Sequence, residues 1–343
     1  MESLECDLDR QYTLLQTIGT GSFAKVKLAI HVLTDEKVAI KIIDKCSIRK
    51  DLHRVYLEIA ALRDFANQYI CKLYQVIETK HRIYLVLEYF LGGELFDNVM
   101  QRELLDEDKG RHFFRQIVSA VAYVHRTGYA HRDLKPEKLL LDTDGNILLV
   151  DFGLCAKTKS GMSAHLRTSC GSGVYAAPEL VAGREYVSSV ANIWSIGVLL
   201  YELVRGCLPF SSDNTGILFR MILVGKCKCP ASLSDRFVNL ISRMMVTSED
   251  RRTTMAQVVD QPCRVVGYEC PASAETTCLG SLLDDEVVAE MDVGCAHPKH
   301  SVDAQIHRRK CQLLRTTATC HRLLEKRTVE GRFGFRRSER RLA

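Results

Sequence analysis

Two short segments of this 343-residue chain place acidic and basic side chains at spacings that suit phosphate chemistry. In residues 131–138, Asp133 can orient a hydroxyl group and accept its proton, and Lys135 can neutralise charge on a phosphoryl group. Asp151-Phe152-Gly153 follows a predicted strand, where the Asp151 carboxylate can hold a magnesium ion that bridges phosphates. Together the two segments indicate phosphoryl transfer.

A glycine-containing segment, residues 18–26 (IGTGSFAKV), lies between two predicted strands. Small side chains let a backbone hairpin approach a phosphate closely and point N–H groups at it. A dinucleotide-binding fingerprint would need a helix after the turn. Taken alone the segment also fits an ordinary β-hairpin, and Ala24 stands at the position of a third glycine.

A lysine ends the apolar strand sequence VAIK at residues 38–41. Lys41 needs a partner, because burying an unpaired ammonium group is unfavourable. Glu58, on a helix predicted over residues 52–65, is the candidate. A structural ion pair, or a Lys41 side chain that extends to solvent, is the alternative interpretation.

A strand ending at Glu88-Tyr89-Phe90 is followed by Gly92, Gly93 and Glu94. Such a strand end exposes backbone N–H and C=O groups that can hold the edge of an adenine ring. The signal is weak by itself, because many strands end in glycines.

Two further residues have partners that the sequence suggests. Thr168 lies between Asp151 and Ala177-Pro178-Glu179, and a phosphate on it could pair with Arg132 and order the segment. An unmodified surface threonine is the alternative. Glu179 needs a buried cationic partner, for which Arg252 is the candidate.

Strand patterns come first along the chain and helical patterns afterwards, which predicts an α+β fold with a sheet-rich first part and a helical second part. The strands are predicted within residues 12–42 and over 73–78, 83–88, 139–141 and 147–150. Besides 52–65, helices are predicted from 111 to Gly128 and beyond 190.

Composition limits the class of protein. Apolar residues make up 46% of the chain, enough for a sizeable core, and the acidic N-terminus predicts no secretory signal. Fourteen cysteines without regular spacing fit reduced thiols, and we expect an intracellular, cytoplasmic location, with the nucleus left open. Residues 301–343 carry a net charge of +8, against −3 for the first 300. This basic end could bind an anionic surface weakly, although a solvated tail is the simpler interpretation.

The motifs resemble those of eukaryotic Ser/Thr protein kinases, in particular the AMP-activated-kinase-related group. The resemblance covers roughly residues 10–264 and is carried by IGTGSFAKVKLA, QIVSAVAYVHRTGYAHRDLKPE, DFGLCAK and YAAPEL. It implies a two-lobed kinase domain over 12–264 with a short helical appendage. The appendage would comprise a linker at 265–282, a ubiquitin-associated-like helical segment at 283–327 and a basic tail at 328–343.

The resemblance also implies ATP and Mg²⁺ as cofactors and Ser or Thr hydroxyls of proteins as acceptors, with no sequence-specific nucleic acid and no membrane span. Thr168 would be an activation-loop phosphorylation site, and Asp133, Lys135, Lys41 and Asp151 would be catalytic, with Asp151 a metal ligand. The ATP-binding residues would be Ile18, Gly19, Thr20, Gly21, Ser22, Phe23, Ala24, Lys25, Val26, Ala39, Lys41, Glu58, Glu88, Phe90 and Glu94.

Three positions depart from the family pattern. Lys138 replaces an Asn that ligates magnesium, and an ammonium group has no lone pair with which to do so. It would repel a nearby divalent ion, or touch a phosphate directly and supply part of the lost charge. Asn192 replaces an Asp that holds the catalytic-loop backbone, and residues 261–263 (QPC) replace His-Pro-Trp. Together the departures suggest a degenerating copy.

The sequence therefore leaves three hypotheses open. The first is an ATP-dependent protein Ser/Thr kinase with weakened activity. The second is a pseudokinase that binds nucleotide or partners as a scaffold, for which Lys138 and Asn192 are the argument. The third is a binding module that acts through its basic tail, and it has no recognised motif to support it. The oligomeric state is not indicated.

Overall fold

The computed structural model describes residues 8–21, 24–49, 51–100, 105–157, 165–166, 173–228 and 233–260, with side chains left out at 98–100 and 165–166. These residues fall into two compact units. The first holds the residues up to Leu52 together with Lys72–Tyr89, and the second holds His53–Cys71 and the residues from Phe90 on. Predictions for the segments at 265–282, 283–327 and 328–343 lie outside the described residues.

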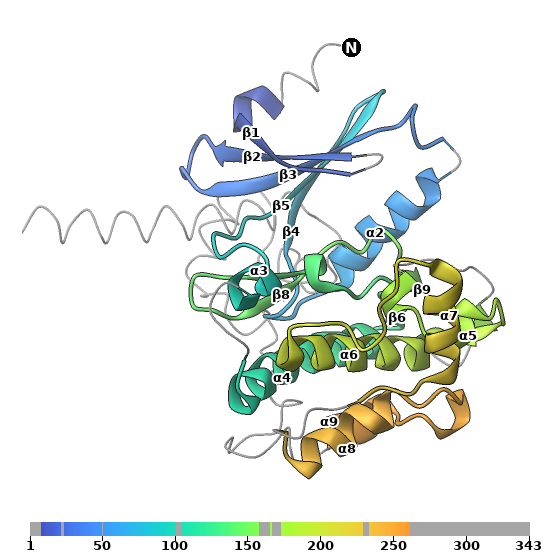
Figure 1. Cartoon of the computed structure of the whole chain (residues 1–343). Helices are drawn as coiled ribbons and strands as arrows, with labels where there is room; N and C mark the ends of the chain where they lie inside the picture. Colours follow the sequence, from blue (N-terminus) through green and yellow to red (C-terminus); the bar gives the residue numbers. More distant parts are fainter. Residues whose placement is uncertain are drawn as a thin grey trace, which may run out of the picture. The chain divides into compact units, whose positions relative to one another are not determined.

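The first unit is built on a five-stranded antiparallel sheet in the order β1-β2-β3-β5-β4 (Figure 1). Alternating β-branched and polar residues produce these strands, and one face buries Ala29, Ile40 and Val86 around the ring of Tyr12. The predicted strands are confirmed. Their bounds are β1 Tyr12–Thr20, β2 Ala24–His31, β3 Lys37–Asp44, β4 Leu73–Glu78 and β5 Arg82–Glu88.

The second unit is mainly helical, as predicted. Helices α4 and α6 lie side by side, and α8 and α9 pack against them (Figure 1). Its helices are α2 (Leu52–Asp64, with Leu52 in the first unit), α3 (Leu95–Met100), α4 (Glu107–Arg126), α5 (Pro178–Val181), α6 (Ser188–Arg205), α7 (Thr215–Val224), α8 (Asp235–Met244) and α9 (Met255–Val259). Its short 3-10 helices are η1 (Pro136–Lys138), η2 (Gly173–Tyr175) and η3 (Glu249–Arg251).

The helix predicted from residue 111 begins four residues earlier, at Glu107. The Asp106 side chain accepts a hydrogen bond of 2.8 Å from the Lys109 backbone N–H and so caps the helix. Apolar periodicity missed this first turn, because its residues are polar and charged. At the other end, Gly128 has a φ of +80°, which is unfavourable for a residue with a side chain and ends the helix as expected.

Short paired strands connect the helices of the second unit. A hairpin of β7 (Leu139–Leu141) and β8 (Ile147–Leu149) carries the chain to Asp151, one residue shorter than the predicted strand at 147–150. In its turn, Asp142 Oδ1 accepts hydrogen bonds from the N–H groups of Asp144 and Asn146. The sequence did not indicate the other pairs, β6 (Tyr129–Ala130) with β9 (Ala156–Lys157) and β10 (His165–Leu166) with β11 (Tyr186–Val187).

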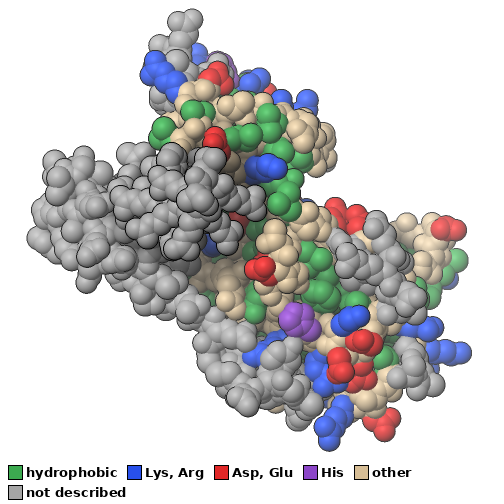
Figure 2. Space-filling model, turned by 90° about the vertical axis from the view of Figure 1, so that its left-hand side faces the viewer, with side chains coloured by type: hydrophobic (Ala, Val, Ile, Leu, Met, Phe, Trp, Pro, Cys, Tyr) green, Lys and Arg blue, Asp and Glu red, His purple; other side chains and the backbone are tan. Residues whose placement is uncertain are grey.

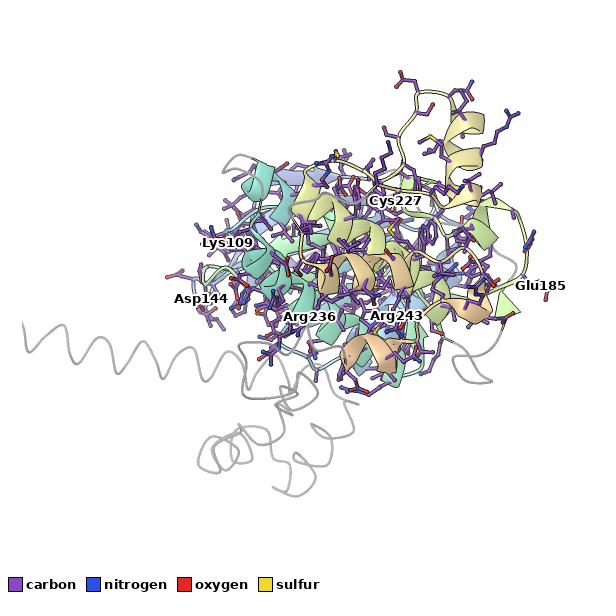
Figure 3. The ribbon with its side chains drawn as sticks, turned by 60° about the horizontal axis from the view of Figure 1, so that its bottom comes forward. Lys109, Asp144, Glu185, Cys227, Arg236 and Arg243 are labelled. Atoms are coloured by element: carbon purple, nitrogen blue, oxygen red, sulfur yellow. The ribbon has the colours of Figure 1, made fainter. Side chains whose placement is uncertain are left out.

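Charged residues of both signs cover the outside of the second unit. On α8 the apolar side chains are buried, whereas Arg236 and Arg243 are exposed (Figure 3). On the face drawn in Figure 2, basic and acidic side chains of the described residues are mixed over its lower part. Within the described residues, no helix is both long enough and apolar enough to cross a bilayer.

Candidate active site

The loop at residues 131–138 is held in place by a buried histidine. His131 has no exposed surface, its Nδ1 accepts from the Asp133 N–H at 3.3 Å, and its Nε2 lies 3.2 Å from the Val150 carbonyl oxygen. These partners require the tautomer that carries its proton on Nε2. Burial lowers the pKa of His131, which keeps the ring neutral in this role. The ring thereby joins the loop to the end of β8.

Asp133 and Lys135 lie together in this loop, as the sequence predicted. The Lys135 Nζ is 3.8 Å from Asp133 Oδ2, and their side chains are 25% and 12% exposed. The carboxylate therefore remains accessible to a hydroxyl group, and the ammonium group beside it can stabilise negative charge that develops on a transferred phosphoryl group.

Lys138 forms an ion pair that the sequence did not predict. Its ammonium group contacts Asp151 Oδ2, the carboxylate expected to hold magnesium. Lys138 ends η1, and Asp151 follows β8 with a φ of +61° and accepts from the Gly153 N–H at 3.4 Å. Among the described residues, no group of three or more His, Cys, Asp or Glu side chains is arranged to bind a metal. The residues present do not fit the metal arrangement that the family implies, because a cationic side chain occupies its carboxylate.

Phe152 anchors the segment that carries Asp151. Its ring is fully buried, with ring centroids 4.8 Å from His131 and 4.9 Å from Phe65. Phe65 in turn contacts Tyr129 edge to face at 5.4 Å. Such aromatic contacts stabilise the packed arrangement beyond the area they bury. The position of Asp151 is thus set by the core of the second unit.

Asn192, the second departure, bonds the catalytic loop weakly. Its Oδ1 accepts from the Arg132 N–H over a long 3.4 Å, so its Nδ2 faces His125 Nε2 at 3.0 Å. His125 Nε2 must then accept, which leaves the proton on Nδ1, and this buried atom has no partner in the described structure. An Asp at this position could accept from both neighbours, and the weaker hold on the loop stays a prediction that the long 3.4 Å bond supports.

The burial of His125 beside Asn192 has a measurable consequence for stability against pH. Burial lowers the pKa of His125 from 6.5 to about 4. Above pH 6.5 the ring is neutral in both states, whereas between 6.5 and 4 only the unfolded chain binds the proton. The free energy of unfolding should therefore fall by about 3 kcal/mol from this residue as the pH drops across that window.

The substitution Asn192→Asp provides the control. A carboxylate beside His125 favours the protonated ring and raises its pKa, so the variant should lose less stability than wild type between pH 7 and pH 5. Urea unfolding at the two pH values measures the difference. Equal losses in both proteins would contradict the role assigned to this contact.

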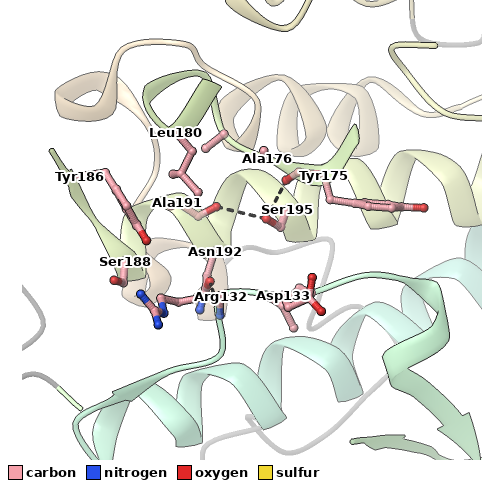
Figure 4. Close-up of a pocket in the computed structure, with 12 residues that line it drawn as sticks. Arg132, Asp133, Tyr175, Ala176, Leu180, Tyr186, Ser188, Ala191, Asn192 and Ser195 are labelled. Atoms are coloured by element: carbon pink, nitrogen blue, oxygen red, sulfur yellow. Dashed lines mark hydrogen bonds between the residues drawn. The ribbon is translucent and has the colours of Figure 1, made fainter. Parts of the chain in front are cut away.

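A small cavity lies beside Arg132 and Asn192 (Figure 4). Its volume is ≈ 20 Å³, which holds about one water molecule and no nucleotide. The Ser195 hydroxyl donates to the Tyr175 carbonyl at 2.9 Å on its wall. Arg132 donates through Nε to the Leu154 carbonyl at 2.7 Å, and no ion pair to a carboxylate is formed by its guanidinium group in the described residues. Thr168, its predicted phosphorylated partner, lies outside them.

The backbone of Gly92, two residues before Glu94, lies very close to the backbone of Leu141 in β7. A Cβ on Gly92 would come within 2.6 Å of the Leu141 carbonyl oxygen, so only glycine fits. The Gly92 N–H and the Gly93 carbonyl are both bonded to Leu141, so these two groups are occupied, and adenine binding by the strand end at 88–90 stays a prediction. Glu94 then bridges to Leu140, and burial, followed by the nearby acids, raises the pKa of its carboxyl group.

The glycine segment and Lys41 meet within the sheet of the first unit. Val26 pairs with Lys41 across β2 and β3, and Gly19 pairs with Val26 across β1 and β2. Ala24 has an ordinary extended conformation, so its side chain causes no backbone strain. Ile18 is 43% exposed, Ala39 is buried, and Ser22 and Phe23 lie outside the described residues.

Two predicted contacts of acidic residues have different outcomes. The pair of Glu179 and Arg252 is confirmed as a buried, bidentate ion pair with distances of 2.6 and 2.8 Å. Lys41 lies in the first unit and Glu58 in the second, so their pairing stays a prediction. The Glu88 carboxylate accepts from the backbone N–H and the Nζ of Lys72, at 3.2 and 3.3 Å, and the Glu88 N–H donates to the Lys72 carbonyl at 3.0 Å, so the part of Glu88 in ATP binding stays a prediction.

One of the scattered cysteines lies next to this site. Burial raises the pKa of Cys155 to about 12, so its thiol stays protonated and unreactive. Cys46, Cys155 and Cys207 carry free thiols in the described part of the chain, and the reduced state of all fourteen cysteines stays a prediction.

Comparison with known proteins gives a single family. The protein kinase domain model matches residues 12–263. The chain is 50% identical over 287 residues to maternal embryonic leucine zipper kinase from Xenopus laevis and from Xenopus tropicalis, and 49% identical to that from Danio rerio. These matches cover 84% of the chain but only 44%, 44% and 42% of the relatives, so it spans less than half of their length. The family model covers more than half of the chain, and the chain therefore belongs to the protein kinase family.

Proposed function

We propose that the chain is an ATP-dependent protein kinase that phosphorylates Ser or Thr hydroxyls, with weakened activity. The placement of Asp133 and Lys135 in one accessible loop, 3.8 Å apart, carries the proposal. In this role Asp133 orients the acceptor hydroxyl and takes its proton, and Lys135 stabilises the charge on the transferred group. The relatives, which are named as kinases, support the same activity.

The residues for ATP are divided between the two units. The first unit carries the glycine segment and Lys41 on its β1–β3 strands, and the second carries Glu94 and Asp151. Magnesium, which kinases generally use with ATP, would supply positive charge to the phosphates, and Asp151 would be its ligand. Because Asp151 is paired with Lys138, we infer that magnesium is bound weakly, which is one reason for the weakened activity.

The proposal also includes phosphorylation of Thr168. Arg132 makes no ion pair to an acidic side chain in the described structure, so its guanidinium group remains suited to a phosphate on Thr168. Such a phosphate would order the segment and raise activity.

Weak binding of the basic tail to anionic surfaces remains a prediction, because the tail lies outside the described residues.

Phosphate incorporation tests this proposal. Purified wild type with radiolabelled ATP and a basic Ser/Thr peptide should label the peptide slowly, and Asp133→Asn should reduce the rate by about 10²-fold, to background, because it removes the base. Acid hydrolysis of the product should yield phosphoserine or phosphothreonine. Equal labelling by wild type and Asp133→Asn would contradict the proposal.

A pseudokinase is the second candidate, and the Lys138–Asp151 pair is the observation that favours it. Under that hypothesis the chain binds nucleotide or partners and transfers no phosphate. Wild type would then remain at background in the labelling experiment, while ATP would still raise its melting temperature.

A further inference from the structure

We propose that the Lys138 ammonium group takes the place of a divalent cation on the phosphates of a bound nucleoside triphosphate, so that nucleotide binding depends little on Mg²⁺. The inference rests on the proposed function, in that it assumes a triphosphate beside Asp151. It adds to that function the identity of the cation on the phosphates, which is the ammonium group of Lys138.

The backbone fixes both partners of the ion pair. The Lys138 N–H donates to the Lys135 carbonyl at 3.0 Å, and the Lys138 carbonyl accepts from the Val150 N–H at 3.0 Å. Val150 directly precedes Asp151, so the segment with the ammonium group is bonded to the segment with the carboxylate. The loop and the hairpin therefore hold Lys138 and Asp151 as neighbours, so that the Lys138 side chain reaches the carboxylate.

The charges favour a phosphate ligand over a free metal ion. Asp151 alone would repel a triphosphate and would need a cation to bridge to it. Lys138 neutralises that carboxylate, and of its three N–H donors only one is needed for Asp151. The other two can reach phosphate oxygens, since the Lys138 and Asp151 side chains remain 18% and 36% exposed. Lys135 supplies a second positive charge in the same loop.

An ordinary structural ion pair is a poor explanation for this arrangement. Partly exposed pairs add little to stability, because water already solvates both charges and ordering the side chains is unfavourable. Here the pair also places a cation within bonding distance of the one carboxylate that the family uses for its metal. A cation at that point can act on phosphates, whereas elsewhere on the surface it would do nothing for a nucleotide.

Direct measurement of ATP affinity with and without Mg²⁺ tests the inference. Isothermal calorimetry on the full chain would compare the Kd for ATP in EDTA with the Kd in excess MgCl₂. Wild type should show a difference below about threefold, whereas Lys138→Asn should bind about tenfold or more weakly in EDTA than in MgCl₂, because a charged hydrogen bond to phosphate is lost. Lys138→Arg retains the cation and should behave like wild type.

Lys109→Asn is the matched control, because it makes the same substitution at an exposed lysine of α4 (Figure 3) that forms no ion pair within the described residues. It should show the wild-type pattern. If wild type requires Mg²⁺ as strongly as Lys138→Asn does, the inference is overturned and the proposed kinase function stands. If no variant binds ATP in either buffer, both fail. Circular dichroism of each variant confirms that a loss of binding is not a loss of fold.

Discussion

Replacing Lys138 by Asn should raise the rate of phosphoryl transfer by about 10²- to 10³-fold, the range over which one positioned electrostatic group acts in an active site. The substitution removes the ammonium group from Asp151 and introduces an amide oxygen that can ligate a metal ion. Both changes restore the Asn and Asp oxygen ligands that the family uses with magnesium. The catalytic groups Asp133 and Lys135 need no change, since they already lie in place.

Initial rates with saturating ATP, MgCl₂ and a basic peptide measure this gain. Lys138→Met separates its two causes, because methionine releases Asp151 without supplying an oxygen ligand. We expect Lys138→Met to gain much less than Lys138→Asn. A Lys138→Asn rate equal to that of wild type would show that the ion pair does not limit catalysis and that the defect lies elsewhere.

Breaking the Glu179–Arg252 pair should have the largest effect on stability. Glu179→Gln should lower the free energy of unfolding by about 3 to 5 kcal/mol, because it leaves the guanidinium charge of Arg252 buried with a neutral partner. Both side chains are essentially inaccessible, at 2% and 0% exposed. Arg252 also lies 5.4 Å from the Trp194 ring and donates to the carbonyls of Val190 and Val246, so it cannot turn out to solvent without breaking these contacts.

Urea unfolding at pH 7 gives this free energy. Glu185→Gln makes the same change at an exposed glutamate nearby in the sequence (Figure 3) and should alter stability by less than about 0.5 kcal/mol. A loss below about 1 kcal/mol for Glu179→Gln would mean that the buried pair contributes no more than a surface pair.

Most of the fold, and the positions of the candidate catalytic residues, could be predicted from the sequence, because each is encoded locally. Alternating apolar residues defined the five strands of the first unit, and motif spacing located Asp133 and Asp151. The partner of Glu179 was also predictable, since a buried carboxylate needs a cation and Arg252 was the candidate. The first turn of α4 was missed because Asp106 caps a polar turn that has no apolar period.

Several contacts of the candidate site could not be predicted, because they join residues brought together only by the fold. The β7–β8 hairpin brings the chain back, so that Asp151 lies beside Lys138. The sequence therefore indicated a lysine near the phosphate and the metal ion, but not the pairing of this lysine with the expected metal ligand. Asn192 and His125 meet where α6 packs on α4. Gly92 was noted only as a glycine that follows a strand end, whereas its close approach to Leu141 is what places Glu94.

The central claim is that this kinase carries its own cation at the position of a metal ion. The Mg²⁺ dependence of the transfer rate, from metal-free buffer to excess MgCl₂, tests it most directly. Wild type should be slow and change by less than about threefold, whereas Lys138→Asn should rise more than about tenfold over the same range and reach a higher plateau. Parallel titration curves for the two proteins would contradict the claim.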